Sequence, residues 1–188
     1  KNPQNFYQQN YLTLKKPSSP QHLQHLPINN NITSILSGAV FHTRSNQGAS
    51  ARNNGTDLTI SAAAVSGGTY GIIARNYGTG ALSVTTTGAV TGTSSIGIRA
   101  YSYGTNMTVS AAAVSGGIDG ISADNRGTGA LSVTSTGAVT GTSGAGIYAR
   151  NVSTSTSLTI SAAAVTGATE GIYASNYGTG TLSVTTTG

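Results

Sequence analysis

The residues best suited to chemistry in this sequence are tyrosines and arginines that recur at regular intervals. They follow the phrase Gly-Ile in each repeat or lie in the turn after it. Tyrosine and arginine are favoured at binding surfaces because each presents a large, stiff area with a polar tip. We therefore predict a ligand-binding face made of Arg75, Tyr77, Arg99, Tyr101, Tyr103, Arg126, Tyr148, Arg150, Tyr173 and Tyr177. The alternative is that these side chains only stack across neighbouring strands and stabilise them.

Acidic residues do not form the pattern of a hydrolytic site. Asp119 and Glu170 share one column of the repeat, but they lie two coils, or about 10 Å, apart, with Ala145 between them. Glycosidases place their two carboxyls either about 5 Å or about 6.5–9.5 Å apart. The only histidine of the repeats is His42, and the Gly-Gly-rich segment 116–120 does not recur every nine residues as calcium-binding repeats do. We expect no enzyme activity, no metal site and no cofactor.

Composition and charge argue against three further classes of protein: disulfide-rich, nucleic-acid-binding and helical membrane-spanning proteins. The 188 residues include no cysteine, so there is no disulfide framework, and only 7% are charged. Of the net charge of +5, three units come from Lys1, Lys15 and Lys16, which precede the repeats. Residues 38–188 hold scattered arginines and no basic run, so we expect no nucleic-acid partner. No stretch is apolar for 18 residues, so no membrane-spanning helix is predicted.

Asparagine recurs at one turn position of the repeat, which we call the asparagine column, and this pattern indicates a structural role. Asparagines stacked in a turn can hydrogen-bond along a repeat structure, and they tolerate positive φ. Ser102 is the exception in this column. The column comprises Asn53, Asn76, Asn125, Asn151 and Asn176.

These side chains are positioned by a repeat of about 24 residues. Its first apolar residues are separated by 24, 25, 24, 27 and 24 residues, and two phrases alternate. Within a unit, residues 82–87 alternate between apolar and polar, a short apolar step follows, and residues 97–101 alternate again, which is strand periodicity. No segment has a helical stripe. The first apolar positions are Leu58, Leu82, Met107, Leu131, Leu158 and Leu182.

A unit of this size cannot bury its own apolar face, but stacked copies can. We therefore predict an all-β fold, a parallel β-helix (β-solenoid) with about 24 residues and three short strands per coil. Further interior ladders begin at Ile60, Val65 and Ile72. The solenoid is expected over residues 38–188, incomplete at both ends. Residues 1–37 match no repeat and are predicted to be a flexible, disordered leader.

Rows of threonine and serine form a second outward face. A regular hydroxyl array could order water, as in ice-binding solenoids, although Ala63, Ala112 and Ala163 interrupt the rows in alternate coils. The simpler interpretation is that threonine suits strands and keeps an uncharged face soluble.

The repeats also resemble a known family. Phrases of the type GTGALSVTTTGAVTGTSSxGIxAxN, free of cysteine and poor in charge, resemble the passenger regions of bacterial autotransporters, the surface proteins of type V secretion. The resemblance covers residues 38–188. It implies a right-handed β-helix, a C-terminal β-barrel that these residues do not include and that would be the only contact with the membrane, and localisation at the cell surface, in the outer membrane or outside the cell.

The resemblance also implies adhesion or aggregation as the activity. We expect a structural or adhesive stalk segment whose partners are a cell-surface protein or glycan, and a chain that self-associates through the open ends of the solenoid. Two alternatives stay open: a fragment of a β-helical enzyme acting on polysaccharides, and a water-ordering solenoid.

Overall fold

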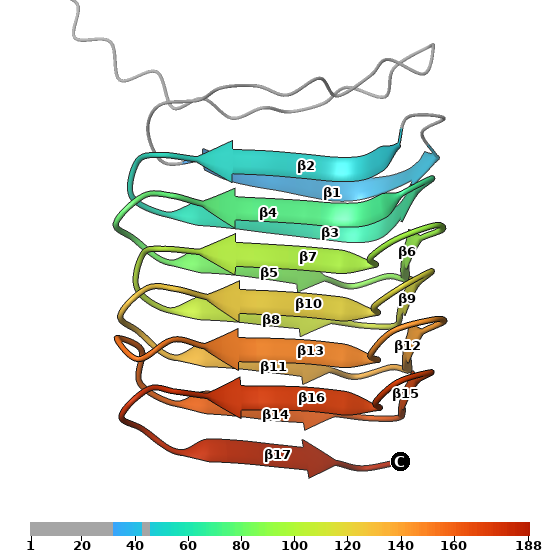
Figure 1. Ribbon diagram of the computed structural model, residues 1–188. Coiled ribbons are helices and arrows are strands. Elements are labelled where there is room, and N and C mark those ends of the chain that lie inside the picture. Colours follow the sequence, from blue (N-terminus) through green and yellow to red (C-terminus); the bar gives the residue numbers. More distant parts are fainter. Residues whose placement is uncertain (1–31, 43–45) are drawn as a thin grey trace, which may run out of the picture.

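The computed structural model describes residues 32–42 and 46–188, and within them the only regular structure is β-strand. The strands wind into a solenoid in which equivalent strands of successive coils lie side by side (Figure 1). This confirms the predicted all-β parallel β-helix. The first strands of the coils are β1 (Ile32–His42), β3 (Leu58–Gly67), β5 (Leu82–Thr86), β8 (Met107–Ala111), β11 (Leu131–Ser135), β14 (Leu158–Ala162) and β17 (Leu182–Thr186).

The other two strand positions complete each coil. The second position is a short strand at the corner: β6 (Val90–Gly92), β9 (Val114–Gly116), β12 (Val139–Gly141) and β15 (Val165–Gly167). The third position is held by β2 (Gln47–Asn53), β4 (Tyr70–Asn76), β7 (Ile98–Ser102), β10 (Ile121–Asn125), β13 (Ile147–Asn151) and β16 (Ile172–Asn176). All pairings are parallel, and the third strands form a separate six-stranded sheet in the order β16-β13-β10-β7-β4-β2.

The early coils differ from the predicted three short strands. Strand β3 pairs with β5 through its first half and with β6 through its second half, so one strand covers two positions. Strand β1 pairs along β3 in the same way, from Ile32 opposite Leu58 to His42 opposite Ser66. The ladder therefore starts before residue 38, where the repeats were predicted to begin. The predicted flexibility of residues 1–31 lies outside the described residues.

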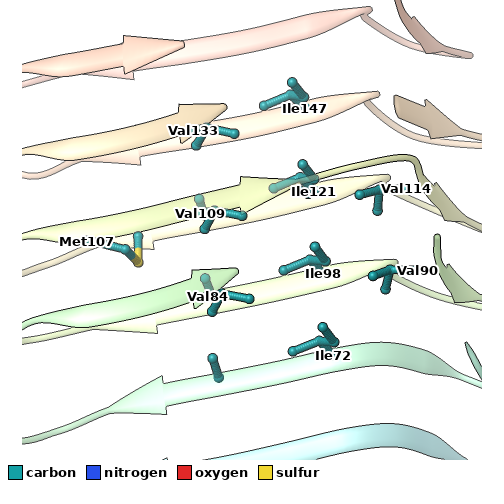
Figure 2. Close-up of a cluster of buried hydrophobic side chains, with 14 of the residues drawn as sticks. Ile72, Val84, Val90, Ile98, Met107, Val109, Val114, Ile121, Val133 and Ile147 are labelled. Atoms are coloured by element: carbon teal, nitrogen blue, oxygen red, sulfur yellow. The ribbon is translucent and has the colours of Figure 1, made fainter. Parts of the chain in front are cut away.

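Alternating side chains explain why the strands form and what they bury. In β5 and β7 every second residue is buried, and those residues face the interior. The register of the parallel strands then places identical or similar residues of successive coils opposite each other, as Ile98 lies opposite Ile72 and Ile121. Figure 2 shows the resulting rows of valine and isoleucine side chains inside the solenoid. This burial of apolar area is the main stabilising term of the fold.

The interior ladders hold through most of the molecule and weaken at its C-terminal end. Leu58, Val84 and Ile147 are fully buried or nearly so. In the last coil, by contrast, Leu182 and Val184 are 48% and 45% exposed, because β17 is the final strand of its sheet and has one neighbour only. The described chain thus ends in an open apolar strand edge.

The corners explain why two phrases alternate. The Asp57 carboxylate accepts a hydrogen bond from the backbone N–H of Ala81 (2.7 Å), and the Asn106 side-chain oxygen accepts one from the N–H of Ala130 (2.9 Å). A Cβ on Gly80 would overlap the Asp57 carboxylate. In these two pairs, the coil that carries the cap is followed by a coil whose corner residue is alanine, which leaves room for the cap.

Candidate ligand-binding face

The outward side of the six-stranded sheet carries the predicted binding residues. Strands β7, β10, β13 and β16 alternate between interior residues and outward polar or aromatic ones, and β4 does so except at Ile73. Register alone therefore brings the outward residues into columns. The turns after these strands add further side chains. We call this surface the Tyr/Arg face, comprising Arg52, Arg75, Tyr77, Arg99, Tyr101, Tyr103, Asp124, Arg126, Tyr148, Arg150, Tyr173 and Tyr177.

Three tyrosines meet in the middle of this face. The rings of Tyr77 and Tyr103 are stacked with centroids 5.7 Å apart, and Tyr101 meets Tyr103 edge-on at 5.1 Å. The Tyr101 hydroxyl donates a hydrogen bond to the Tyr103 hydroxyl (2.7 Å). Tyr77 and Tyr103 are nevertheless 40% and 47% exposed. Residues from two coils thus form one aromatic patch that remains open to solvent.

Arginines flank this aromatic patch. The Arg52 guanidinium lies 4.5 Å from the centroid of the Tyr77 ring, and that of Arg126 lies 5.0 Å from the Tyr101 ring. Such cation–π contacts contribute about 0.5–1 kcal/mol at exposed sites. Arg126 also forms an ion pair with Asp124, from Nε to Oδ2 at 2.9 Å. The patch is therefore held in one arrangement by its own side chains.

A second aromatic pair lies two coils further along. The rings of Tyr148 and Tyr173, direct cross-strand neighbours, are parallel within 4° with centroids 4.9 Å apart. The Arg150 guanidinium lies 5.7 Å from the Tyr177 ring, which is 61% exposed. Cross-strand stacking therefore accounts for part of the tyrosine pattern, and Tyr177 remains the most exposed ring of the face.

The surroundings of three tyrosines shift the pKa values of their phenol groups. Burial, followed by donation to Tyr103, raises the pKa of Tyr101 to about 12. Burial also raises the pKa of Tyr148. At the beginning of β4, a hydrogen bond with Ser95 and the nearby Arg99 guanidinium lower the pKa of Tyr70. The raised pKa values of Tyr101 and Tyr148 keep these two phenols neutral near pH 7.

Arg52 and Ile73 are the positions where sequence reasoning about this face fell short. Arg52 was not among the predicted binding residues, although segment 48–55 aligns with 97–104 and so places it on the outward side. Ile73 shares the outward column of Arg99, yet it is fully buried and lies outside the interior cluster. Arg75 and Arg99 lie on the face as predicted, and Arg75 is the direct cross-strand neighbour of Tyr101 in the aromatic patch.

The asparagine column lies inside the turns. Asn53, Asn76, Asn125 and Asn151 are fully buried. The Asn53 amide donates to the Asn76 side-chain oxygen at 3.0 Å, and the same bond joins Asn125 to Asn151 at 3.2 Å. Each amide also donates a hydrogen bond to a backbone carbonyl of its own turn, as Asn76 does to the Gly80 carbonyl (2.9 Å). These contacts occupy the amides and support a structural role.

Asp57 and Asp119 each accept a hydrogen bond from a backbone N–H of the next coil. Asp119 Oδ1 accepts a hydrogen bond from the N–H of Ala145 at 2.9 Å, and Glu170, two coils away in the same column, is exposed. Within residues 32–42 and 46–188, no three histidine, cysteine, aspartate or glutamate residues gather as metal ligands would. The expectation from the sequence that this column has no catalytic activity stays a prediction.

The hydroxyl face lies on the first strands of the coils. Its two outward columns alternate strictly, so that each threonine has a serine beside it in the next coil, as Ser83 lies beside Thr59 and Thr108. None of these hydroxyls hydrogen-bonds another residue in the described part of the chain. The columns are Thr59, Ser83, Thr108, Ser132, Thr159, Ser183 and Ser61, Thr85, Ser110, Thr134, Ser161, Thr185.

Across the described ranges, no helix has the length and apolar character needed to cross a bilayer. Comparison of the chain with protein-family models, with curated proteins and with solved structures gives no match.

Proposed function

We propose that this chain is a structural and adhesive stalk segment of a bacterial autotransporter passenger displayed at the cell surface. The observation that carries the proposal is the gathering of tyrosine and arginine on one face of an otherwise uniform solenoid. On the first strands, by contrast, the outward residues of the hydroxyl face are only serine and threonine, which alternate from coil to coil. A face that concentrates aromatic and cationic side chains is expected of a scaffold that presents a binding surface.

Two physical features support export and display. The chain has no cysteine, so it can pass through an oxidising compartment without cross-linking. Each coil contacts mainly its neighbours, so folding can proceed coil by coil after secretion. Both properties suit a passenger that folds outside the cell.

The adhesive function can be tested by display. We would fuse the full 188-residue chain to a surface-display anchor, and score attachment of the bacteria to host cells and to each other. The variant Tyr77→Ser/Tyr103→Ser should reduce attachment, because it removes two exposed rings of the patch. The control Thr85→Ala/Thr134→Ala changes the hydroxyl face and should leave attachment unchanged. Equal attachment of all three strains would contradict the proposal.

Assignment to the autotransporters needs a different measurement. Sequencing the surrounding gene through to its stop codon should reveal a downstream stretch of alternating amphipathic strands. A gene that closes within a few coils would remove the autotransporter assignment and leave a free-standing solenoid.

The hydroxyl face favours a second candidate, a water-ordering solenoid. Its two regular columns have no partner among the described residues and no charge. Thermal hysteresis of the purified chain would support this candidate. Freezing behaviour equal to that of a size-matched inert protein would exclude it.

A further inference from the structure

We propose that the Tyr/Arg face binds a linear acidic polysaccharide, one that carries carboxylate or sulfate groups along its length, running parallel to the solenoid axis. The inference rests on the proposed adhesive function and names the chemical class of its ligand.

The first argument is the spacing of positive charge along the axis. The strands β2, β4, β7, β10 and β13 are consecutive in the sheet, and each of these five coils contributes one arginine. Because neighbouring strands lie about 4.8 Å apart, the guanidinium groups form a strip about 20 Å long. A polymer with regularly repeated anionic groups can meet such a strip at several points. The arginines are Arg52, Arg75, Arg99, Arg126 and Arg150.

The second argument is that the strip is only partly neutralised by its own acidic residue. Arg52 and Arg75 are direct cross-strand partners, and like charges opposite each other destabilise a sheet. Within the described residues, the one ion pair of the face joins Arg126 to Asp124. Arg150 is the direct cross-strand neighbour of the same Asp124 without an ion pair to it, and Arg75 and Arg99 have no acidic cross-strand neighbour. An external anion would relieve this repulsion, and arginine binds carboxylate and sulfate groups in a bidentate manner.

The third argument is the chemistry beside the arginines. Tyr77, Tyr103 and Tyr177 expose ring surface next to the cationic strip. The C–H faces of a pyranose ring pack against aromatic rings, while phenol hydroxyls can bond sugar hydroxyls. Cations and aromatic surface in one strip therefore suit an acidic sugar chain.

The experiment measures binding of the full 188-residue chain to immobilised polymers at about 0.15 M salt, where long-range attraction is screened. The probes are dextran sulfate, neutral dextran as its backbone-matched control, polygalacturonate, and duplex DNA. The test variant is Arg75→Gln/Arg99→Gln. The control variant Lys15→Gln/Lys16→Gln removes the same charge from outside the face. Circular dichroism and sedimentation establish that each variant keeps the fold and association state of the parent chain.

We expect the parent chain to bind dextran sulfate and polygalacturonate and not dextran. Arg75→Gln/Arg99→Gln should weaken binding by at least about tenfold, since each arginine loses a charge-assisted hydrogen bond. The lysine variant should bind as the parent does, and Arg75→Lys/Arg99→Lys should retain part of the affinity.

Three results would overturn the inference: equal binding to dextran and dextran sulfate, equal losses in the arginine and lysine variants, or binding to DNA as tight as to the acidic polysaccharides. The proposed adhesive function is separable from this outcome. Attachment to cells that persists after enzymatic removal of acidic polysaccharides would refute the inference and leave adhesion standing, whereas absence of attachment to any cell would refute adhesion itself.

Discussion

Asn76 shows how a single side chain joins two coils. Its oxygen accepts hydrogen bonds from the Asn53 amide (3.0 Å) and from the N–H of Gly78 (3.1 Å), and its amide donates to the Gly80 carbonyl (2.9 Å). The side chain is fully buried. Removing it leaves several polar groups without partners in a place that water does not reach.

We therefore predict that Asn76→Ala destabilises the chain by about 2 kcal/mol or more. The measurement is the shift of the urea unfolding transition. The matched control is Asn176→Ala, which removes the same residue type from the same column in a half-exposed position and should cost less. Equal shifts for the two variants would show that the buried amide ladder contributes nothing.

Tyr101 gives a prediction about pH. Its pKa is raised from about 10 to about 12, first by burial and then by donation to Tyr103. The folded state therefore favours the neutral phenol. The resulting stability is present below about pH 10 and is lost as the pH rises from about 10 towards about 12.

Alkaline titration of phenolate absorbance tests this sign. The step that Tyr101→Phe removes should lie near pH 12. Tyr103→Phe should move that step to lower pH, because it takes away the hydrogen-bond acceptor. A step for Tyr101 at its ordinary pKa would disprove the buried, hydrogen-bonded arrangement of the aromatic patch.

Among the elements, the entrance to a third strand requires glycine where a further coil stacks on it. A Cβ on Gly120 would lie 2.6 Å from both Val139 Cγ1 and the Gly146 carbonyl oxygen of the next coil. At the equivalent Gly171 the nearest atom is the Val165 carbonyl oxygen at 3.4 Å, an ordinary contact. The two glycines occupy the same position of the phrase. The difference therefore arises because a further coil is stacked against Gly120, whereas no described coil is stacked in this way against Gly171.

Gly120→Ala should consequently destabilise the chain by about 1–3 kcal/mol, the range found for overpacked sites. Gly171→Ala should be close to neutral. Thermal unfolding followed by circular dichroism checks both variants, and an unchanged midpoint for Gly120→Ala would contradict the close contact between coils.

Strand positions were readable from the sequence because alternation is local. The pattern Leu82, Val84, Thr86 reveals its buried face without knowledge of any other coil. The corner caps were not readable in this way. The bond from Ala81 to Asp57 joins residues of different coils and depends on the stacking register. Similarly, the burial of Ile73 cannot be inferred from its own phrase, which places it outward.

At the scale of the whole described solenoid, the open edge at β17 predicts association of the 188-residue chain. Strand β17 pairs with β14 and has no further neighbour in its sheet, and Leu182 and Val184 are about half exposed. An exposed strand edge with apolar side chains is a template for pairing with another chain. We expect the average mass of this 188-residue chain to rise with concentration in sedimentation equilibrium.

A charged variant identifies the surface responsible. Val184→Lys should lower the association, because lysine at a strand edge opposes pairing. Ser183→Lys, on the same strand but on the outward side, serves as the control and should have a weaker effect. A mass that does not change with concentration would refute association through this edge.

The composition of the Tyr/Arg face was predictable at this scale, and its internal arrangement was not. Columns follow from the repeat length, so Arg75, Tyr101 and Arg150 could be placed on one side from their spacing alone. Side-chain directions within the face, such as Arg126 turning to both Tyr101 and Asp124, depend on rotamers that a repeat pattern does not specify.

The alternating corners also constrain how a gene for such a chain can change its length. Repetitive DNA gains and loses copies by unequal recombination. Loss of the coil 82–106 would leave the Ala130 N–H above Ala81, without the side-chain acceptor that Asn106 now supplies. Loss of both coils, 82–130, would preserve the alternation. Selection should therefore tolerate changes in even numbers of coils, so that natural length variants differ by pairs.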